Sequence, residues 1–226
     1  MKIALTPVSN LVEQLRVVKN EEELSLIRQS VKLNEQVFEK IFPEISPEMS
    51  EIEVALAIES TMRLVGAESA SFETIVLSGE NGALVHGVPS PTQIPQGSPI
   101  TIDMGLIYSG YCSDMTRNFV LGKTDDTYLE IHRLVRRAQK AGINAVRAGA
   151  VAADVDRAAR QIISNAGYGK NFGHSLGHGV GMAVHEEPRI SGKSRKKLKE
   201  GMVITIEPGV YLPGWGGVRL ENMVVV

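Results

Sequence analysis

Residues 100–105 read Ile-Thr-Ile-Asp-Met-Gly, and residues 204–209 read Ile-Thr-Ile-Glu-Pro-Gly. A second matched pair has nearly the same spacing, with Ala-Leu-Val-His-Gly-Val-Pro at 83–89 and Met-Ala-Val-His-Glu-Glu-Pro at 182–188. Two matched pairs about 100 positions apart indicate an internal duplication, in which each copy is one structural unit. We therefore expect both halves of the chain to have the same order of secondary structure.

The segment before the first copy carries two helix signals. Apolar residues recur at the helical period between Asn20 and Phe42, and Asn20 and Glu23 have the spacing of a capping box. A second helix is predicted to begin at Ser50 and to end at Gly66. Its inward face is predicted to consist of Ile52, Leu56, Met62 and Val65.

After Gly66 the pattern changes to that of strands. A strand is predicted at 71–77, and two more are predicted within 98–121, joined around Ser109-Gly110. Two copies of this helix-helix-strand-hairpin order must bury their apolar faces on each other. We therefore predict an α+β fold with pseudo-two-fold symmetry, in which one antiparallel sheet is backed by four helices. The second copy is predicted as helices at 126–146 and 153–166, a strand-like stretch from Phe172 and a hairpin from Met202 to the end.

Composition limits the classes of partner. The chain has 226 residues and a net charge of -2, so it lacks the excess of cations with which proteins bind nucleic acids. No stretch is long enough to span a bilayer, and the apolar run after Lys2 is too short for a signal-peptide core. Cys112 is the single cysteine and cannot form an internal disulfide, which favours a reducing compartment. These features predict a cytoplasmic protein that binds neither nucleic acid nor membrane.

Each predicted hairpin presents two carboxylates. Asp103 and Asp114 lie on opposite arms of the first hairpin, and Glu207 and Glu221 lie on opposite arms of the second. Facing residues on paired strands come within reach of one ion. Four acids gathered from two symmetry-related hairpins would repel one another unless cations lay among them. The pattern therefore favours a site for two divalent metal ions, because carboxylates suit such ions and can bridge them.

Histidines gather near the same segments. Of the five histidines, four lie at or beside the duplicated segments, whereas His132 is predicted to be exposed on a charged helix. Glycines around His174 and His178 argue against a regular helix and for close backbone approach, which favours a site. The Gly-x-Gly pattern here also occurs in dinucleotide-binding proteins, but we find no Rossmann unit around it. The four candidate site histidines are His86, His174, His178 and His185.

Five dispersed residues carry a resemblance to a known family. Asp103, Asp114, His178, Glu207 and Glu221 are similar, in order and spacing, to the five metal ligands of the pita-bread metallopeptidases. That family includes methionine aminopeptidase, Xaa-Pro aminopeptidase and Xaa-Pro dipeptidase (prolidase). Arg219 favours the proline-directed branch, because methionine aminopeptidases usually lack an arginine two residues before the final ligand. The resemblance extends from about Lys19 to Val226, and the segments most similar to the proline-directed branch are 111–117, 177–181, 184–190 and 217–222.

The resemblance implies a fold, a reaction and a role for each site residue. The fold is the pita-bread (creatinase/aminopeptidase) fold, and the reaction is hydrolysis of Xaa-Pro peptide bonds by a hydroxide that bridges two divalent metal ions. Manganese is the expected metal, with cobalt or zinc as alternatives. Glu207 would be both ligand and proton acceptor. His86 and His185 would orient the substrate and stabilise the intermediate, and His174 would line the same pocket. Arg189 or Arg219 would bind either a substrate carboxylate or a metal-binding acid. For Arg219 the second of these roles is favoured.

The resemblance also predicts the organisation of the chain. Residues 1–18 would be the remnant of a linker from an absent N-terminal domain, and residues 19–226 would be the catalytic domain. The expected substrate is a peptide with proline at its second position, and a homodimer is expected from the resemblance alone. Dipeptidase and aminopeptidase activity both stay open. Two other functions also stay open: a hydrolase similar to methionine aminopeptidase, and a binding protein of this fold that has lost the reaction.

Overall fold

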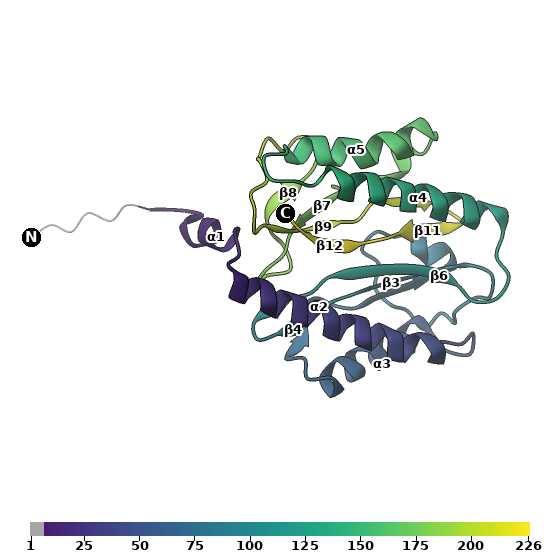
Figure 1. Cartoon of the computed structure of the whole chain (residues 1–226). Helices are drawn as coiled ribbons and strands as arrows, with labels where there is room; N and C mark the ends of the chain where they lie inside the picture. Colours follow the sequence, from purple (N-terminus) through teal and green to yellow (C-terminus); the bar gives the residue numbers. More distant parts are fainter. Residues whose placement is uncertain (1–6) are drawn as a thin grey trace, which may run out of the picture.

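The fold places helices on the outside and strands between them (Figure 1). The computed structural model describes residues 7–226, so the apolar run after Lys2 and the first six residues of the predicted linker lie outside the described residues. Within that range, no helix combines the length and the apolar character that crossing a membrane requires. The α-helices are α1 (Leu11–Arg16), α2 (Glu21–Ile41), α3 (Glu51–Leu64), α4 (Asp126–Ala145) and α5 (Ala152–Asn165), and the 3₁₀ helices are η1 (Phe42–Glu44), η2 (Gly79–Ala83) and η3 (Gly169–Asn171).

The strands pair antiparallel throughout residues 7–226 and form separately hydrogen-bonded sheets rather than one continuous sheet. The sheet orders are β2-β3-β6, β1-β4-β5, β12-β9-β7-β8 and β10-β11. The pairing of β9 with β12 ends at Ile206, shortly before Pro208, because proline has no backbone N–H to donate. The strand bounds are Ser69–Ala70 (β1), Ile75–Ser78 (β2), Pro99–Met104 (β3), Leu106–Tyr108 (β4), Tyr111–Cys112 (β5), Met115–Val120 (β6), Gly177–Gly179 (β7), Glu186–Ile190 (β8), Val203–Ile206 (β9), Gly209–Leu212 (β10), Gly216–Arg219 (β11) and Asn222–Val225 (β12).

Each half of the chain has its own apolar core, as the duplication predicts. In the first half, α2 and α3 pack on β3, with Ile58 and Ile100 fully buried between them. In the second half, α4 and α5 pack on β9, with Ile131 and Ile204 fully buried. Figure 1 shows the two helix pairs on opposite outer faces of the strand layer. The predicted α+β class, antiparallel strands backed by helices and repeated element order are therefore confirmed.

The capping signals were reliable, whereas the predicted inward face of α3 was partly wrong. Capping boxes are present at Asn20 with Glu23 and at Ser50 with Glu53. Ile52 and Leu56, predicted to turn inward, are 36% and 58% exposed. The helical period allows a face shifted by about one position toward the N-terminus to turn inward instead. That buried face consists of Val54, Ala55, Ile58 and Met62.

Some predicted boundaries in the irregular segments were also wrong. The first-half strand begins at Ile75 rather than at residue 71. The strand expected from Phe172 is β7, which begins at Gly177, and Phe172 is buried with its ring 4.0 Å from the Arg160 guanidinium. His132 is half-buried rather than exposed, and its ring lies 5.4 Å from that of Tyr128. The predicted turn at Ser109-Gly110 is confirmed, because both residues have the positive φ that such turns use.

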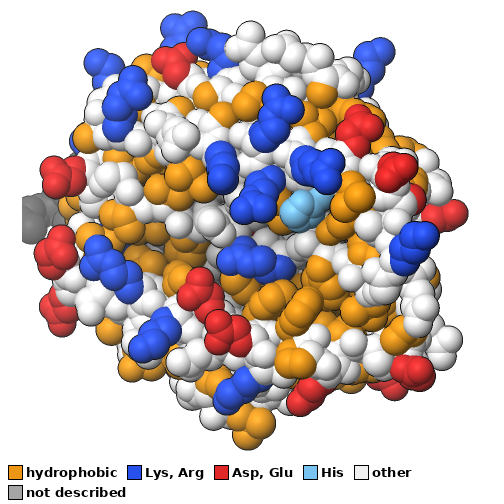
Figure 2. Space-filling model, turned by 45° about the vertical axis from the view of Figure 1, so that its right-hand side comes forward, with side chains coloured by type: hydrophobic (Ala, Val, Ile, Leu, Met, Phe, Trp, Pro, Cys, Tyr) orange, Lys and Arg blue, Asp and Glu red, His pale blue; other side chains and the backbone are white. Residues whose placement is uncertain are grey.

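The surface carries both signs of charge, and the chain has nearly equal numbers of basic and acidic residues, 24 and 26. On the face shown in Figure 2, Lys and Arg side chains lie between apolar patches, and Asp and Glu lie mostly toward the edges. Exposed apolar residues of this kind are ordinary for a folded protein when they are scattered.

Glu51, the first residue of α3, is a fully buried acid that ties three segments together. Its carboxylate accepts hydrogen bonds from the backbone N–H of Ser78 at 2.6 Å, the side chain of Asn81 at 3.2 Å and the hydroxyl of Ser90 at 2.7 Å. Its position in the first helical turn also favours the negative charge. Because Ser78 and Ser90 flank the segment that carries His86, Glu51 holds that segment against α3.

Glu51→Leu should therefore destabilise the protein. We expect the free energy of unfolding to fall by about 3 kcal/mol, because several buried donors lose their acceptor. Urea unfolding measures the change. Glu59→Leu, at an exposed position of the same helix, is the matched control and should change the free energy by no more than about 0.5 kcal/mol. Equal effects of the two variants would contradict the role given to Glu51.

Candidate functional site

All ten sequence-predicted site residues line one cavity. Its volume is about 1040 Å³, and it lies between the two halves of the chain. No predicted site residue lies elsewhere. The ten residues are His86, Asp103, Asp114, His174, His178, His185, Arg189, Glu207, Arg219 and Glu221.

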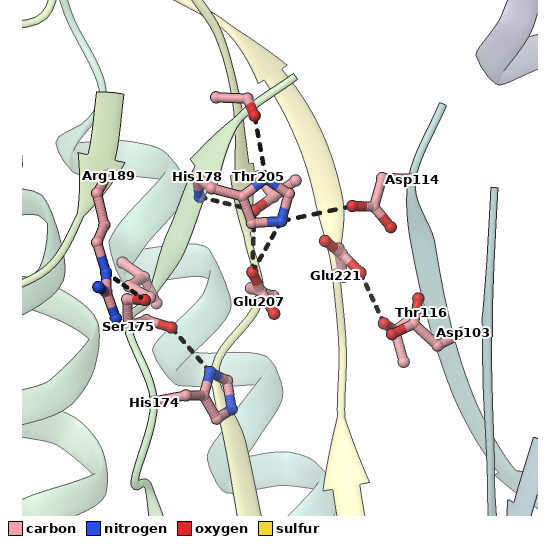
Figure 3. Close-up of polar contacts among 12 residues, drawn as sticks. Asp103, Asp114, Thr116, His174, Ser175, His178, Arg189, Thr205, Glu207 and Glu221 are labelled. Carbon is pink, nitrogen blue, oxygen red and sulfur yellow. Dashed lines mark hydrogen bonds and ion pairs between the residues drawn. The ribbon is translucent and has the colours of Figure 1, made fainter. Parts of the chain in front are cut away.

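The four acids lie at or next to the ends of strands. Asp103 is on β3 and pairs with Thr116 of β6, so that Asp114, just before β6, lies beside it. In the second half, Ile206 pairs with Asn222. Glu207 and Glu221 occupy the next positions, where each strand leaves the ladder, and Figure 3 shows Glu221 between Glu207 and the two acids of the first half. The matched repeat positions thus bring acids from both halves to one place.

His178 projects from β7 between the two groups of acids (Figure 3). Its Nδ1 lies 3.0 Å from the carbonyl oxygen of Gly179. A carbonyl can only accept, so Nδ1 carries the proton and Nε2 presents a lone pair. Nε2 lies 3.5 Å from Asp114 Oδ2 and 3.4 Å from Glu207 Oε1. Ligand atoms of Asp114, His178 and Glu221 lie within 4.8 Å of one another, close enough to share one ion.

Burial and mutual repulsion shift the acids toward their neutral forms. Burial, with the Glu221 charge next in size, holds the pKa of Asp114 and that of Glu207 well above the ordinary range. Burial and then the Asp103 charge raise the pKa of Glu221 to about 8. Burial lowers the pKa of His178 to about 4, so its imidazole is neutral at pH 7. Crowded, buried carboxylates beside a neutral imidazole favour the binding of cations, which would offset the repulsion between the acids.

The residues present fit divalent metal ions. Asp103 Oδ1 is buried without any hydrogen-bond donor, an arrangement that is costly unless another partner binds there. Asp114, Glu207 and Glu221, in the same cavity, offer three more carboxylates, and His178 offers an imidazole lone pair. A donor set of oxygens with a single nitrogen suits ions such as Mn, Co or Zn. Asp103, Asp114, His178, Glu207 and Glu221 are the residues that could hold them.

Arg219 is buried behind the acids and holds Asp103. Its Nη2 donates to Asp103 Oδ2 at 2.6 Å, and its Nε donates to Thr116 Oγ1 at 3.1 Å. The Thr116 hydroxyl in turn donates to Glu221 Oε2 at 2.6 Å. Arg219 thus fixes one acid directly and another through Thr116. Its position fits the acid-fixing role that the resemblance favoured.

Two threonines orient the site and were not identified from the sequence. Thr116 acts as described, and Thr205 Oγ1 accepts the backbone N–H of His178 and donates to Glu207 Oε1, both at 3.1 Å. A signal for Thr205 was present, because it lies in the repeated Ile-Thr-Ile segment two residues before Glu207. Thr116 had only a weak signal, its place two residues after Asp114.

The remaining predicted site residues differ in how firmly hydrogen bonds hold them and in how exposed they are. His174 has both ring nitrogens engaged, with Nδ1 at 2.8 Å from Ser175 O and Nε2 at 2.9 Å from Tyr211 OH, so it lines the cavity as a fixed group. His86 and His185 are exposed to the cavity, and the His185 ring lies 4.3 Å from the His178 ring. Arg189 is exposed, and its Nε donates to Ser175 Oγ at 3.2 Å.

Cys112 lies close to the site but is not positioned as a nucleophile. Its thiol is buried, and burial raises its pKa to about 11, so it is protonated at neutral pH. A thiolate, rather than a thiol, is the reactive form. The sequence-based prediction that Cys112 has no nucleophilic role is therefore supported by its surroundings.

The acid cluster predicts how stability depends on pH. Between its ordinary pKa of 4.5 and the raised value of about 8, Glu221 keeps its proton in the folded metal-free protein and loses it on unfolding. The folded state then binds more protons, so the free energy of unfolding should fall as the pH rises from 7 to 8, by about 1.4 kcal/mol per excess proton. His174 and His178 do not oppose this, because lowered pKa values leave both neutral above pH 7.

Bound divalent metal should reverse this dependence of the free energy of unfolding on pH. Bound cations replace the protons, so metal binding should release protons and tighten as the pH rises. Urea unfolding at pH 7 and 8, with chelator and with excess Mn²⁺, measures both effects. A metal-free protein equally stable at the two pH values would contradict the raised pKa values of the acids.

Comparison with known proteins gives one family. Residues 25–226 match the family described as metallopeptidase family M24. The Xaa-Pro dipeptidase of Pyrococcus furiosus is 42% identical over 219 residues, which cover 97% of this chain and 63% of that protein. The chain therefore spans less than two thirds of the length of this relative.

Solved structures agree with the sequence match. The X-Pro aminopeptidase from Thermotoga maritima MSB8 has a TM-score of 0.95 at 42% identity, and the match covers 97% of this chain and 62% of that one. The Xaa-Pro dipeptidase from Bacillus anthracis has a TM-score of 0.96 at 43% identity, with coverage of 97% and 62%. Likeness at this level confirms the pita-bread fold that the sequence predicted.

Proposed function

The chain belongs to metallopeptidase family M24, and from that premise we propose that it is a metal-dependent exopeptidase that hydrolyses Xaa-Pro bonds, as a dipeptidase or an aminopeptidase. Residues 19–226 would form the catalytic domain, with the residues before Lys19 as a linker. One observation carries the proposal: the four acids and His178 converge in a single cavity together with Arg219, the residue that favours the proline-directed branch.

We propose that Asp103, Asp114, His178, Glu207 and Glu221 hold two divalent ions, with Mn²⁺ as the first choice. Such a pair, when bound, acidifies the attacking water and polarises the carbonyl of the scissile peptide. The orphaned Asp103 Oδ1 and the crowded, buried carboxylates support this assignment. The single, buried cysteine supports a reducing compartment such as the cytoplasm.

Glu207 is the proposed proton carrier. Its carboxylate would take a proton from the attacking water and deliver it to the nitrogen of the departing residue. In an Xaa-Pro peptide this nitrogen belongs to a secondary amine, which must be protonated as the C–N bond breaks. Thr205, which donates to Glu207 Oε1, supports this role because it fixes the direction of the carboxylate.

His86 and His185 are the proposed donors to the reacting carbonyl. Both are exposed to the cavity, and hydrogen bonds aimed at the oxygen where charge develops stabilise the transition state. His174 would act less directly, by holding Tyr211 beside Arg219. Arg189 would bind a substrate carboxylate, because its exposed guanidinium is a fork of donors that matches that group.

Hydrolysis of a small peptide panel tests the proposal. Metal is removed with a chelator and Mn²⁺ is added back, and the rates with Ala-Pro, Ala-Pro-Ala and Met-Ala-Ser are compared. We expect metal-dependent cleavage of the proline peptides and little cleavage of Met-Ala-Ser. Preference for Met-Ala-Ser would favour a function similar to methionine aminopeptidase. Proline-peptide rates no higher than those of Glu207→Gln would overturn the proposed reaction.

A further inference from the structure

The loop that carries His185 is fixed at both ends by polar contacts. At its start, the carbonyl oxygen of Gly181 accepts the backbone N–H of Cys112 at 2.8 Å, and the N–H of Gly181 donates to Ala183 O at 3.1 Å. Cys112 lies two residues before Asp114, so this end of the loop is tied directly to the acid cluster. At the other end the loop passes into Glu186.

The Glu186 side chain folds back under the loop. Its Oε1 accepts the backbone N–H of Ala183 at 3.0 Å, which closes the loop on itself. The side chain is only 8% exposed. A Cβ built on Gly181 would lie 2.6 Å from Glu186 Oε2, so the absence of a side chain at Gly181 makes room for this carboxylate.

Two cations from the segment before α2 hold that carboxylate. Arg16 forms an ion pair with Glu186 Oε1, and Lys19 Nζ lies 3.2 Å from Oε2. The Lys19 side chain is 1% exposed. Its backbone is anchored as well, because its N–H donates to Gly201 O at 2.9 Å and the preceding Val18 forms a bridge with Met202. A buried lysine with one carboxylate partner is a strong constraint on where that partner lies.

The neighbouring ion pair of Lys196 and Glu187 is exposed, in contrast to the buried pair of Lys19 and Glu186. Its Nζ–Oε2 distance is also 3.2 Å, but the two side chains are 45% and 55% exposed. Pairs of that kind constrain little, because water screens them and both side chains stay mobile. The pair of Lys19 with Glu186, by contrast, is buried on both sides and is connected to the loop that reaches the acid cluster.

We propose that Lys19 is a positioning residue, which acts through Glu186 to hold the 181–186 loop so that the His185 ring stays against His178. The inference rests on the proposed function for its kinetic part and on geometry alone for its structural part. Loss of the lysine charge would leave Oε2 of the buried Glu186 without its cation, with only the part-exposed Arg16 still paired to Oε1. The carboxylate would then turn toward water and take the loop with it. His185 would then leave the place where it can reach a substrate.

The test compares Lys19→Met, Lys19→Arg and the control Arg157→Met, which removes an exposed ion pair on α5. With Mn²⁺ present and Ala-Pro-Ala as substrate, we expect Lys19→Met to lower kcat by about tenfold to a hundredfold, because small displacements of catalytic groups have effects of that size. Metal content should stay unchanged, since no ligand is altered. Lys19→Arg should restore most of the rate, and Arg157→Met should leave it unchanged.

A second readout does not depend on activity. In metal-free protein labelled at histidine Cε1, the His185 resonance, assigned with His185→Asn, should shift and broaden in Lys19→Met while that of His132 stays in place. Glu186→Gln should give the same change if Lys19→Met fails to fold. An unchanged His185 resonance, or a kcat within twofold of the wild type, overturns the proposal. Wild-type protein without proline-peptide cleavage would overturn the proposed function instead, and the resonance would still test the positioning.

Discussion

Glu207→Gln is expected to lower kcat for proline peptides by about 10³-fold, within the range by which a placed acid or base accelerates proton transfer. The amide has the same shape and can still accept from Thr205, whose hydroxyl lies 3.1 Å from Glu207 Oε1. It cannot take a proton from water or deliver one to a leaving nitrogen. The substitution therefore removes proton transfer by Glu207 with little change in packing. It also removes one proposed anionic metal ligand, so kcat has to be compared at saturating Mn²⁺.

The same substitution should stabilise the metal-free protein. Burial and the Glu221 charge hold the pKa of Glu207 well above its ordinary range, so the folded protein resists ionisation of this group. A neutral amide removes that conflict, and the midpoint of thermal unfolding in chelator should rise at pH 8. The opposite direction of the two effects is informative, because a variant that merely misfolds would lose both activity and stability.

Steady-state kinetics at saturating Mn²⁺ and thermal unfolding in chelator measure the two effects. Glu200→Gln is the matched control, since Glu200 is exposed just before β9 and should change neither quantity. A kcat for Glu207→Gln within tenfold of the wild type would contradict the role of proton carrier. A lower unfolding midpoint would contradict the electrostatic conflict among the acids.

The fold could be predicted where the signal is local or repeated. The capping boxes at Asn20 and Ser50 involve residues three apart, so the sequence alone specifies where α2 and α3 begin. The inward face of α3 was less predictable. Ile52 and Leu56 are as apolar as Val54 and Ile58, and only the position of the neighbouring strands decides which pair is buried.

The candidate site could be predicted because duplication placed its acids at matching positions. Asp103 and Glu207 follow the same Ile-Thr-Ile segment, and no tertiary information is needed to see this. The hydrogen bonds that orient the site residues could not be predicted in this way. The hydroxyl of Thr116 bonds Glu221 over a separation of 105 residues, and Lys19 bonds Glu186 over 167. Contacts between residues so far apart in the sequence depend on how the two halves pack, and the local sequence pattern does not predict them.

Arg219→Met should destabilise the metal-free protein by about 3–5 kcal/mol, because it breaks a buried ion pair. The arginine is 2% exposed and lies in direct contact with Asp103. Asp103 Oδ1 already lacks a donor, and removal of Arg219 would leave Oδ2 without its ion-pair partner as well. The carboxylate would then be buried among three other acids with nothing to offset its charge.

Metal should rescue this variant more than it rescues the wild type, because cations bound by Asp103 replace the charge that the arginine supplied. Urea unfolding in chelator and in excess Mn²⁺ gives both free energies. The double variant Arg219→Met with Asp103→Asn isolates the cause, since removal of the unpaired charge should recover about half of the loss in chelator. A loss under about 1 kcal/mol for Arg219→Met, or no recovery in the double variant, would show that Arg219 stabilises the protein by packing and not by holding Asp103.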